Sequence, residues 1–269
     1  MIKVPKKSLF VGSLIATLAM VGVNVLSMFP IINGLRTQDV SDAYPNLFTP
    51  SGITFSIWGV IYLFALIFIL FQLFSKQKLV KKDQASLQTI NKIYIITCLL
   101  NATWLITWQF KIFWLSVIIM VGLLLGLISI MREIKKSTIT RGLRFWLNST
   151  FGFYLGWIMV ATIANVTVLL VSSGWEAFGN IAEWWTVAIL AVGALLGSIT
   201  TLVFKNIYCS ATLVWGYVGI LLQHLDVDKF NGQYGNILTA VIVSIVVIGI
   251  CGLIGAVRSK APIEASSKH

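Results

Sequence analysis

The sequence has very little charge for its length. Only 11% of its 269 residues are Asp, Glu, Lys or Arg, whereas 58% are hydrophobic, and the mean hydropathy is +0.90. A soluble domain typically carries about 25% charged residues, so this chain lacks the polar surface that water requires. The composition excludes a cytosolic enzyme, a secreted disulfide scaffold and a nucleic-acid-binding domain, despite a net charge of +11.

Cysteine and proline are also scarce, and ionisable side chains are missing from the apolar runs. Cys98, Cys209 and Cys251 share no close spacing, so no zinc pattern, CxxC pair or disulfide framework is readable. No proline interrupts a run after the first, so the sequence does not indicate the broken helices of many secondary transporters. Without buried charge, a proton-coupled pump is not indicated. We expect no catalytic residue and no metal ligand.

Long apolar runs dominate the sequence instead. A helix needs about 20 mostly apolar residues to span a bilayer core of about 30 Å, and eight runs reach or approach that length: 9–30, 53–74, 93–110, 112–131, 145–171, 187–204, 207–224 and 237–257. Lys111 separates the third run from the fourth, and Lys205 and Asn206 separate the sixth from the seventh. One long helix at each place is the alternative, but two spans joined by a tight turn match the bilayer better. We predict an all-α, polytopic transmembrane helix bundle.

The basic residues predict the orientation of this bundle, because cytoplasmic loops are rich in Lys and Arg. With eight spans and both termini in the cytoplasm, all basic residues except Arg36, Lys111 and Lys229 fall on the cytoplasmic side. The run 9–30 is longer than the apolar core of a signal peptide and no A-x-A cleavage site follows it, so we expect an uncleaved first helix. We expect a multi-pass protein of the cell (cytoplasmic) membrane. Its partners include the lipid bilayer and no nucleic acid.

Three of the runs carry aromatic and amide side chains at one helical spacing. The sets are Phe55, Trp58 and Tyr62; Asn101, Trp104 and Trp108; and Tyr154, Trp157 and Ala161, continuing to Asn165. Positions i, i+3 and i+7 lie on one face of a helix, and lipid gives no reason to keep such side chains together. We expect these stripes to face the interior. There they either pack against one another or line a cavity in the outer half of the membrane, with Trp157 as its floor.

Other Trp residues and several glycine pairs have simpler interpretations. An interfacial aromatic belt explains the Trp residues near predicted outer boundaries, which are Trp108, Trp114, Trp175, Trp184 and Trp185. Gly122 and Gly126, Gly152 and Gly156, and Gly193 and Gly197 are spaced for close helix contact. Packing within the chain is the preferred interpretation of these pairs, and a homodimer is the alternative.

The stripes resemble motifs of the tryptophan-rich sensory protein family, also called the translocator protein or peripheral benzodiazepine receptor family (TspO/MBR). Pro50 and Gly52, followed by Phe55, Trp58 and Tyr62, are similar to the family's first loop and second helix. The third-helix motif L-N-x-x-W is matched by Leu100, Asn101 and Trp104, and the fifth-helix pattern Y-x-x-W-x-x-x-A-T-x-x-N by residues 154–165. The resemblance covers about residues 9–171. It implies a five-helix domain over 1–171 and a three-helix membrane extension over 172–269.

Family members are five-helix bundles that bind porphyrins, haem-like tetrapyrroles, sterols or synthetic ligands. The resemblance implies a membrane receptor, sensor or transport aid for a small flat apolar ligand, which is a tetrapyrrole such as a porphyrin or haem-like molecule, or a sterol-like molecule. It implies no resident cofactor. The binding residues that it implies are Phe55, Trp58, Tyr62, Asn101, Trp104, Tyr154, Trp157 and Ala161. A facilitative transporter of small apolar or amphipathic metabolites is the alternative.

Residues 31–52 occupy the place of the family's first loop, which acts as a lid over the pocket. This lid has no Trp, and residue 53 is Ile where the family usually has Trp. Light-dependent porphyrin breakdown depends on that aromatic lid in the family, so we do not expect an enzyme.

Overall fold

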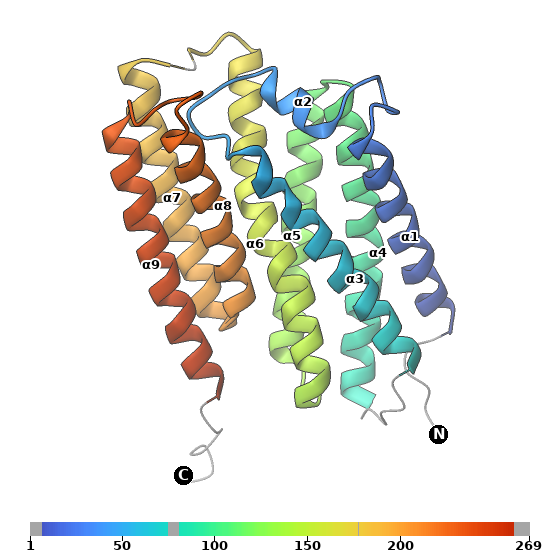
Figure 1. Cartoon of the computed structure of the whole chain (residues 1–269). Helices are drawn as coiled ribbons and strands as arrows, with labels where there is room; N and C mark the ends of the chain where they lie inside the picture. Colours follow the sequence, from blue (N-terminus) through green and yellow to red (C-terminus); the bar gives the residue numbers. More distant parts are fainter. Residues whose placement is uncertain (1–6, 75–80, 177, 261–269) are drawn as a thin grey trace.

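The computed structural model describes residues 7–74, 81–176 and 178–260, which form an all-helical bundle without strands (Figure 1). The long helices are α1 (Lys7–Met28), α3 (Ile57–Phe74), α4 (Lys81–Gln109), α5 (Phe113–Lys136), α6 (Arg141–Ser172), α7 (Asn180–Phe204), α8 (Ile207–Leu225) and α9 (Gly235–Lys260). Two short elements, α2 (Thr37–Asp42) and the 3-10 helix η1 (Gly52–Ser56), lie between α1 and α3. The prediction of a polytopic helix bundle is confirmed.

Each of the eight predicted runs coincides with one long helix. Within the described residues, seven helices are long and apolar enough to cross a membrane, and α8 is the long helix that falls short. This helix carries buried polar side chains, including Ser210, Thr212 and His224, which lower its hydropathy. It nevertheless runs alongside α7 and α9 in the bundle (Figure 1). Eight crossings therefore stay a prediction.

The two tight turns are confirmed, and each one is made by a lysine. Lys111 and Lys205 adopt the left-handed backbone conformation, with φ of 58° and 50°. At Lys205 the amide of Asn206 donates to Thr201 O at 3.1 Å and the amide of Lys205 donates to Leu202 O at 3.4 Å. This pair of bonds is a Schellman motif, which closes a helix end by satisfying its last carbonyl groups. A single lysine in the left-handed conformation therefore lets the chain turn back between two helices.

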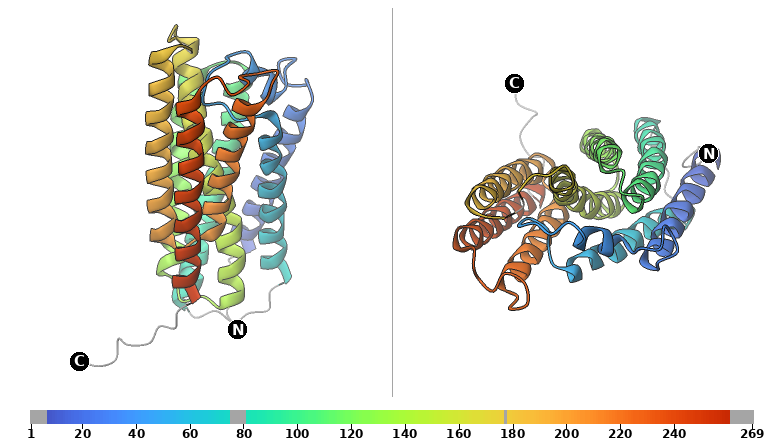
Figure 2. Two further views of the ribbon diagram at one scale, coloured as in Figure 1. Left: turned by 60° about the vertical axis from the view of Figure 1, so that its left-hand side comes forward. Right: turned by 90° about the horizontal axis from the view of Figure 1, so that it is seen from above.

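Helix α6 is the central helix of the bundle. It packs against α3 and α5 on one side and against α7 and α8 on the other, and the view along the bundle shows it between the two groups of helices (Figure 2). The segments 1–171 and 172–269 therefore share a large interface. The division of the chain into two domains at residue 171 stays a prediction.

The predicted glycine pairs lie at contacts within the chain. A Cβ atom on Gly156 would come within 2.5 Å of Cys209 O, and one on Gly152 would collide with the Asn206 side chain. Asn206 also donates from its side chain to Asn148 O at 2.9 Å and accepts from the amides of Tyr208 and Cys209. Small residues on α6 thus let the capped start of α8 approach closely.

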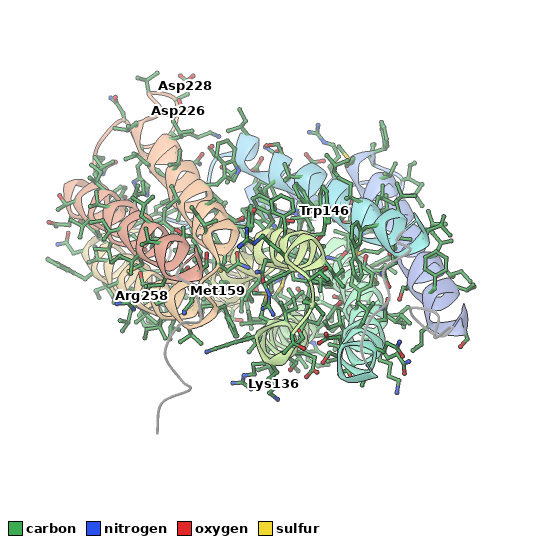
Figure 3. The ribbon with its side chains drawn as sticks, turned by 90° about the horizontal axis from the view of Figure 1, so that it is seen from below. Lys136, Trp146, Met159, Asp226, Asp228 and Arg258 are labelled. Atoms are coloured by element: carbon green, nitrogen blue, oxygen red, sulfur yellow. The ribbon has the colours of Figure 1, made fainter. Side chains whose placement is uncertain are left out.

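Basic side chains gather at one end of the bundle. The 137–140 turn, the 205–206 turn, the start of α1 and the end of α9 lie at the same end (Figure 1). Lys136 at the end of α5 and Arg258 near the end of α9 are labelled in the view from that end (Figure 3). The opposite end holds α2 and the loop between α8 and α9, which contains Asp226 and Asp228 (Figure 1). This asymmetry agrees with the predicted orientation, which stays a prediction.

Replacing Gly156 by alanine will loosen the contact between α6 and α8. The added methyl group would meet the backbone carbonyl of Cys209, which cannot move aside as a flexible side chain could. Overpacking of this kind typically lowers the free energy of unfolding by about 1–3 kcal/mol. Thermal unfolding in detergent should show a clear decrease in Tm for Gly156→Ala. Gly249→Ala is the matched control, because nothing lies within 4 Å of its added Cβ atom. Equal Tm values for the two variants would contradict this packing.

Cysteine labelling in intact cells tests the orientation. In a Cys251→Ser background, a membrane-impermeant maleimide should label Asp228→Cys directly, and Lys136→Cys only after permeabilisation. Both native residues are exposed, and the α8–α9 loop and the end of α5 that carry them lie at opposite ends of the bundle (Figure 1). The reverse pattern would show that the basic end faces outward.

Candidate ligand-binding site

Trp58 is the centre of an aromatic cluster that joins three helices. Its ring centroid lies 5.5 Å from that of Tyr62, 5.9 Å from Trp104, 6.1 Å from Trp157 and 6.2 Å from Tyr154. Phe55 meets Trp157 edge-on at 5.8 Å. These separations suit offset or edge-to-face ring pairs. The stripes on η1–α3, α4 and α6 therefore do turn toward one another, as their spacing predicts.

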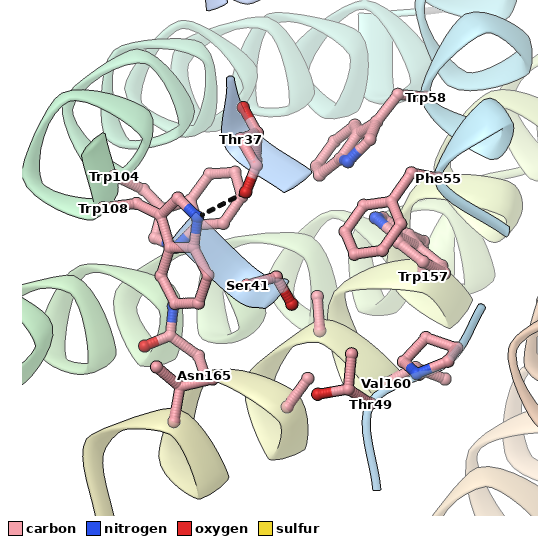
Figure 4. Close-up of a pocket in the computed structure, with 14 residues that line it drawn as sticks. Thr37, Ser41, Thr49, Phe55, Trp58, Trp104, Trp108, Trp157, Val160 and Asn165 are labelled. Carbon is pink, nitrogen blue, oxygen red and sulfur yellow. Dashed lines mark hydrogen bonds between the residues drawn. The ribbon is translucent and has the colours of Figure 1, made fainter. Parts of the chain in front are cut away.

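A cavity beside this cluster is small. It has a volume of about 30 Å³, which is room for one or two water molecules. It is lined by Thr37, Ser41, Thr49, Pro50, Phe55, Trp58, Trp104, Trp108, Trp157, Val160, Ala161, Ala164, Asn165 and Val168 (Figure 4). Five of the eight predicted binding residues are in this lining. A macrocycle does not fit in it unless side chains or the lid move.

A much larger crevice lies on the other side of Trp58, between α1 and α3. Its volume is about 520 Å³, and its lining comes from α1, α2, η1, α3 and Leu105 of α4. Phe55, Trp58 and Thr37 line both spaces and so form the partition between them. Exposed Met28 and Gly59 border the crevice, so it opens on the side of the bundle, where lipid is expected.

Four polar atoms in the cluster are buried without a hydrogen-bond partner. They are Tyr62 Oη, Asn101 Nδ2, Trp104 Nε1 and Trp157 Nε1. Indole and amide nitrogens only donate, so a partner for them must offer acceptors. A buried donor left unpaired costs about 1–3 kcal/mol, and hydrocarbon offers no replacement. All four belong to residues predicted for binding.

Asn101 and Tyr154 lie beneath the cavity and line neither space. Asn101 Oδ1 accepts from Asn24 Nδ2 at 2.8 Å, which ties α4 to α1. Tyr154 supports the underside of Trp58, and its hydroxyl lies 3.9 Å from the Met20 sulfur atom. Asn165, the last residue of the third stripe, donates to Ser116 Oγ of α5 at 2.7 Å and also borders the cavity.

The predicted lid, residues 31–52, is held down over the cavity by α4. Trp108 Nε1 donates to Thr37 O at 3.1 Å (Figure 4), and Asn33 Nδ2 donates to Gln109 O at 2.9 Å. Val40 and Phe48 are fully buried. Trp108 is only 5% exposed, so its assignment to an interfacial belt is wrong. The lid has no Trp of its own, and Trp108 of α4 contacts it instead.

The charged part of the lid forms a local ion pair at the rim of the crevice. Arg36 Nη2 lies 2.8 Å from Asp39 Oδ1, and these hydrogen bonds hold the pKa of the Asp39 carboxyl below its ordinary value. The same contact raises the pKa of Arg36. Arg36 therefore stays charged and is neutralised by its neighbour. No three His, Cys, Asp or Glu side chains gather closely enough to hold a metal ion in the part of the chain that the structure describes.

Sequence reasoning missed the residues that close the cavity from above and from the side. Thr37, Ser41 and Thr49 of the lid have no periodic signal, because they lie in loop and in one short helix. Val160, Ala164 and Val168 continue the α6 face that carries Trp157 and Ala161. Extending that stripe by further helical turns would have found them.

Comparison with known proteins gives one match. A family model described as TSPO-like protein matches residues 10–254, from α1 into α9 and well past the motif region. No curated protein and no solved structure matches the chain.

Proposed function

The chain belongs to the TSPO-like protein family, and on that premise we propose that it is a membrane receptor or transport aid for a flat, apolar ligand that carries hydrogen-bond acceptors. A tetrapyrrole such as protoporphyrin, or a sterol-like molecule bearing oxygen, has this chemistry. The protein acts by binding and performs no covalent step.

The observation that carries this proposal is the set of unpaired donors around Trp58. Trp104 and Trp157 present their N–H groups, and Tyr62 its hydroxyl, with no acceptor in reach. Aromatic faces supply stacking area for a planar molecule. The donors then select for carbonyl, carboxylate or imine acceptors over plain hydrocarbon, because only an acceptor removes the cost of burying them.

The crevice supplies the volume that the small cavity lacks. At about 520 Å³ it falls within the range of about 300–1,000 Å³ that is typical of small-molecule sites. Tyr62, Trp58 and Phe55 form its wall toward the bundle core. A ligand that arrives from the lipid between α1 and α3 therefore meets the aromatic cluster first. Rotation of Trp58, which is half-buried, would join the crevice to the inner cavity and give the ligand access to Trp104 and Trp157.

The expected location follows from the asymmetry of charge. The basic end of the bundle faces the cytoplasm in the proposed orientation. The lid, the crevice rim and the aromatic cluster then lie in the outer half of the cell membrane. We assign ligand capture to that half.

Removing single indole N–H groups tests the proposal. Trp104→Phe and Trp157→Phe keep an aromatic ring but lose the donor, so each should weaken protoporphyrin binding by about two- to tenfold, the value of one hydrogen bond. Affinity is measured by the change in porphyrin absorbance on titration, because the substitutions alter protein fluorescence. Trp114→Phe is the matched control, since Trp114 is 60% exposed on the outside of α5.

Two results would count against the proposal. One is the absence of saturable absorbance change with the unaltered protein. The other is equal affinity for Trp104→Phe, Trp157→Phe and Trp114→Phe, which would mean that internal water or packing satisfies the donors.

A further inference from the structure

Helix α8 contacts the chain segment 47–54, which joins the lid to α3, at three successive positions. Trp215 Nε1 donates to Thr54 O at 3.0 Å. The carbonyl of Gly219 accepts from the amide of Ser51 at 3.0 Å. His224 Nε2 lies 2.9 Å from Leu47 O. Trp215 and Gly219 are four positions apart and share a helical face. His224 is five positions further on, about 140° around the helix, in the last turn of α8. These three contact residues are called the α8 strip below.

These contacts are directed at backbone and are closely fitted. A Cβ atom on Gly219 would collide with the Thr54 side chain, so glycine is needed for α8 and the segment 47–54 to approach each other. Thr54 and Leu47 are each 1% exposed. The anchored segment contains Thr49 and Pro50, which line the small cavity. The strip on α8 therefore fixes one wall of the candidate site.

The ring of His224 is held in place by its own surroundings. It stacks on Phe230 at 4.7 Å and meets Tyr234 edge-on at 5.9 Å. The amide of Gly232 donates to His224 O at 2.8 Å. The loop between α8 and α9 thus orients the ring toward Leu47 before any ligand is present.

We propose that the α8 strip formed by Trp215, Gly219 and His224 anchors the lid and sets how fast ligand enters and leaves the pocket. This assigns a role to the C-terminal three-helix extension: it positions the lid and does not itself touch ligand. Trp108 anchors the lid from α4, so the lid is fastened on both sides of the cavity. The claim about rates rests on the proposed function, whereas the anchoring does not.

Hydrogen exchange measured by mass spectrometry tests the anchoring without ligand. Trp215→Phe keeps an aromatic ring and removes the donor to Thr54 O, so exchange in peptides covering 47–54 should rise about two- to tenfold. Gly219→Ala should raise it further because it forces the segment away. Trp114→Phe and Gly249→Ala are the matched controls and should leave exchange in this segment unchanged. Unchanged exchange in Trp215→Phe would overturn the proposal even if Gly219→Ala failed to fold.

Stopped-flow binding of protoporphyrin tests the effect on rates. In Trp215→Phe the association and dissociation rate constants should both rise by the same factor as the exchange, with little change in Kd. A purely structural role would instead raise dissociation alone and lower Tm, which would overturn the claim about rates. If exchange rises as expected but protoporphyrin binds to no variant, the anchoring is supported and the proposed function is the part that fails.

Discussion

The structure depends on how polar side chains are paired where no water is available. Hydrocarbon cannot replace a missing hydrogen-bond partner, so the spans must satisfy their polar groups internally. Over most of the bundle they do: Ser13, Asn91 and Gln72 link α1, α4 and α3, and Thr17 pairs with Tyr94 at 2.8 Å. Ser198 Oγ, Thr201 Oγ1 and His224 Nδ1 are also unpaired, but around Trp58 four unpaired atoms belong to neighbouring side chains. This concentration of unpaired donors separates a candidate binding site from ordinary helix packing.

The same constraint explains how the two parts of the chain fit together. Helix α8 is the least apolar of the predicted spans, and it is surrounded by α6, α7 and α9. Its polar groups face protein: Ser210 Oγ donates to Ile248 O at 2.9 Å, and Tyr217 Oη donates to Leu190 O at 2.7 Å. Trp215, Gly219 and His224 contact the segment 47–54. The extension is therefore continuous with the site in structure, although the family motifs lie before it.

Sequence alone predicted the helices well because composition and span length are strong constraints in a membrane. The turns at Lys111 and Lys205 were found from one charged residue each, since a charge at mid-membrane is costly. The stripes around Trp58, Trp104 and Trp157 were found from helical spacing. Trp108 was misassigned because a Trp at a span boundary fits an interfacial belt as well as a lid contact. Trp215 lies too deep in its run for an interfacial belt, but neither its role nor that of His224 could be predicted, because their partners are backbone carbonyls more than 150 positions away.

We propose that the buried indole N–H groups donate to an acceptor on the ligand, and indole nitrogen resonances report directly on such hydrogen bonds. The full chain, labelled with ¹⁵N at tryptophan and placed in lipid nanodiscs, would be compared with and without protoporphyrin. We expect the N–H signals of Trp104 and Trp157 to move to the positions of hydrogen-bonded indoles, while the signal of exposed Trp184 stays in place. Saturable porphyrin binding that leaves both buried signals unmoved would contradict it.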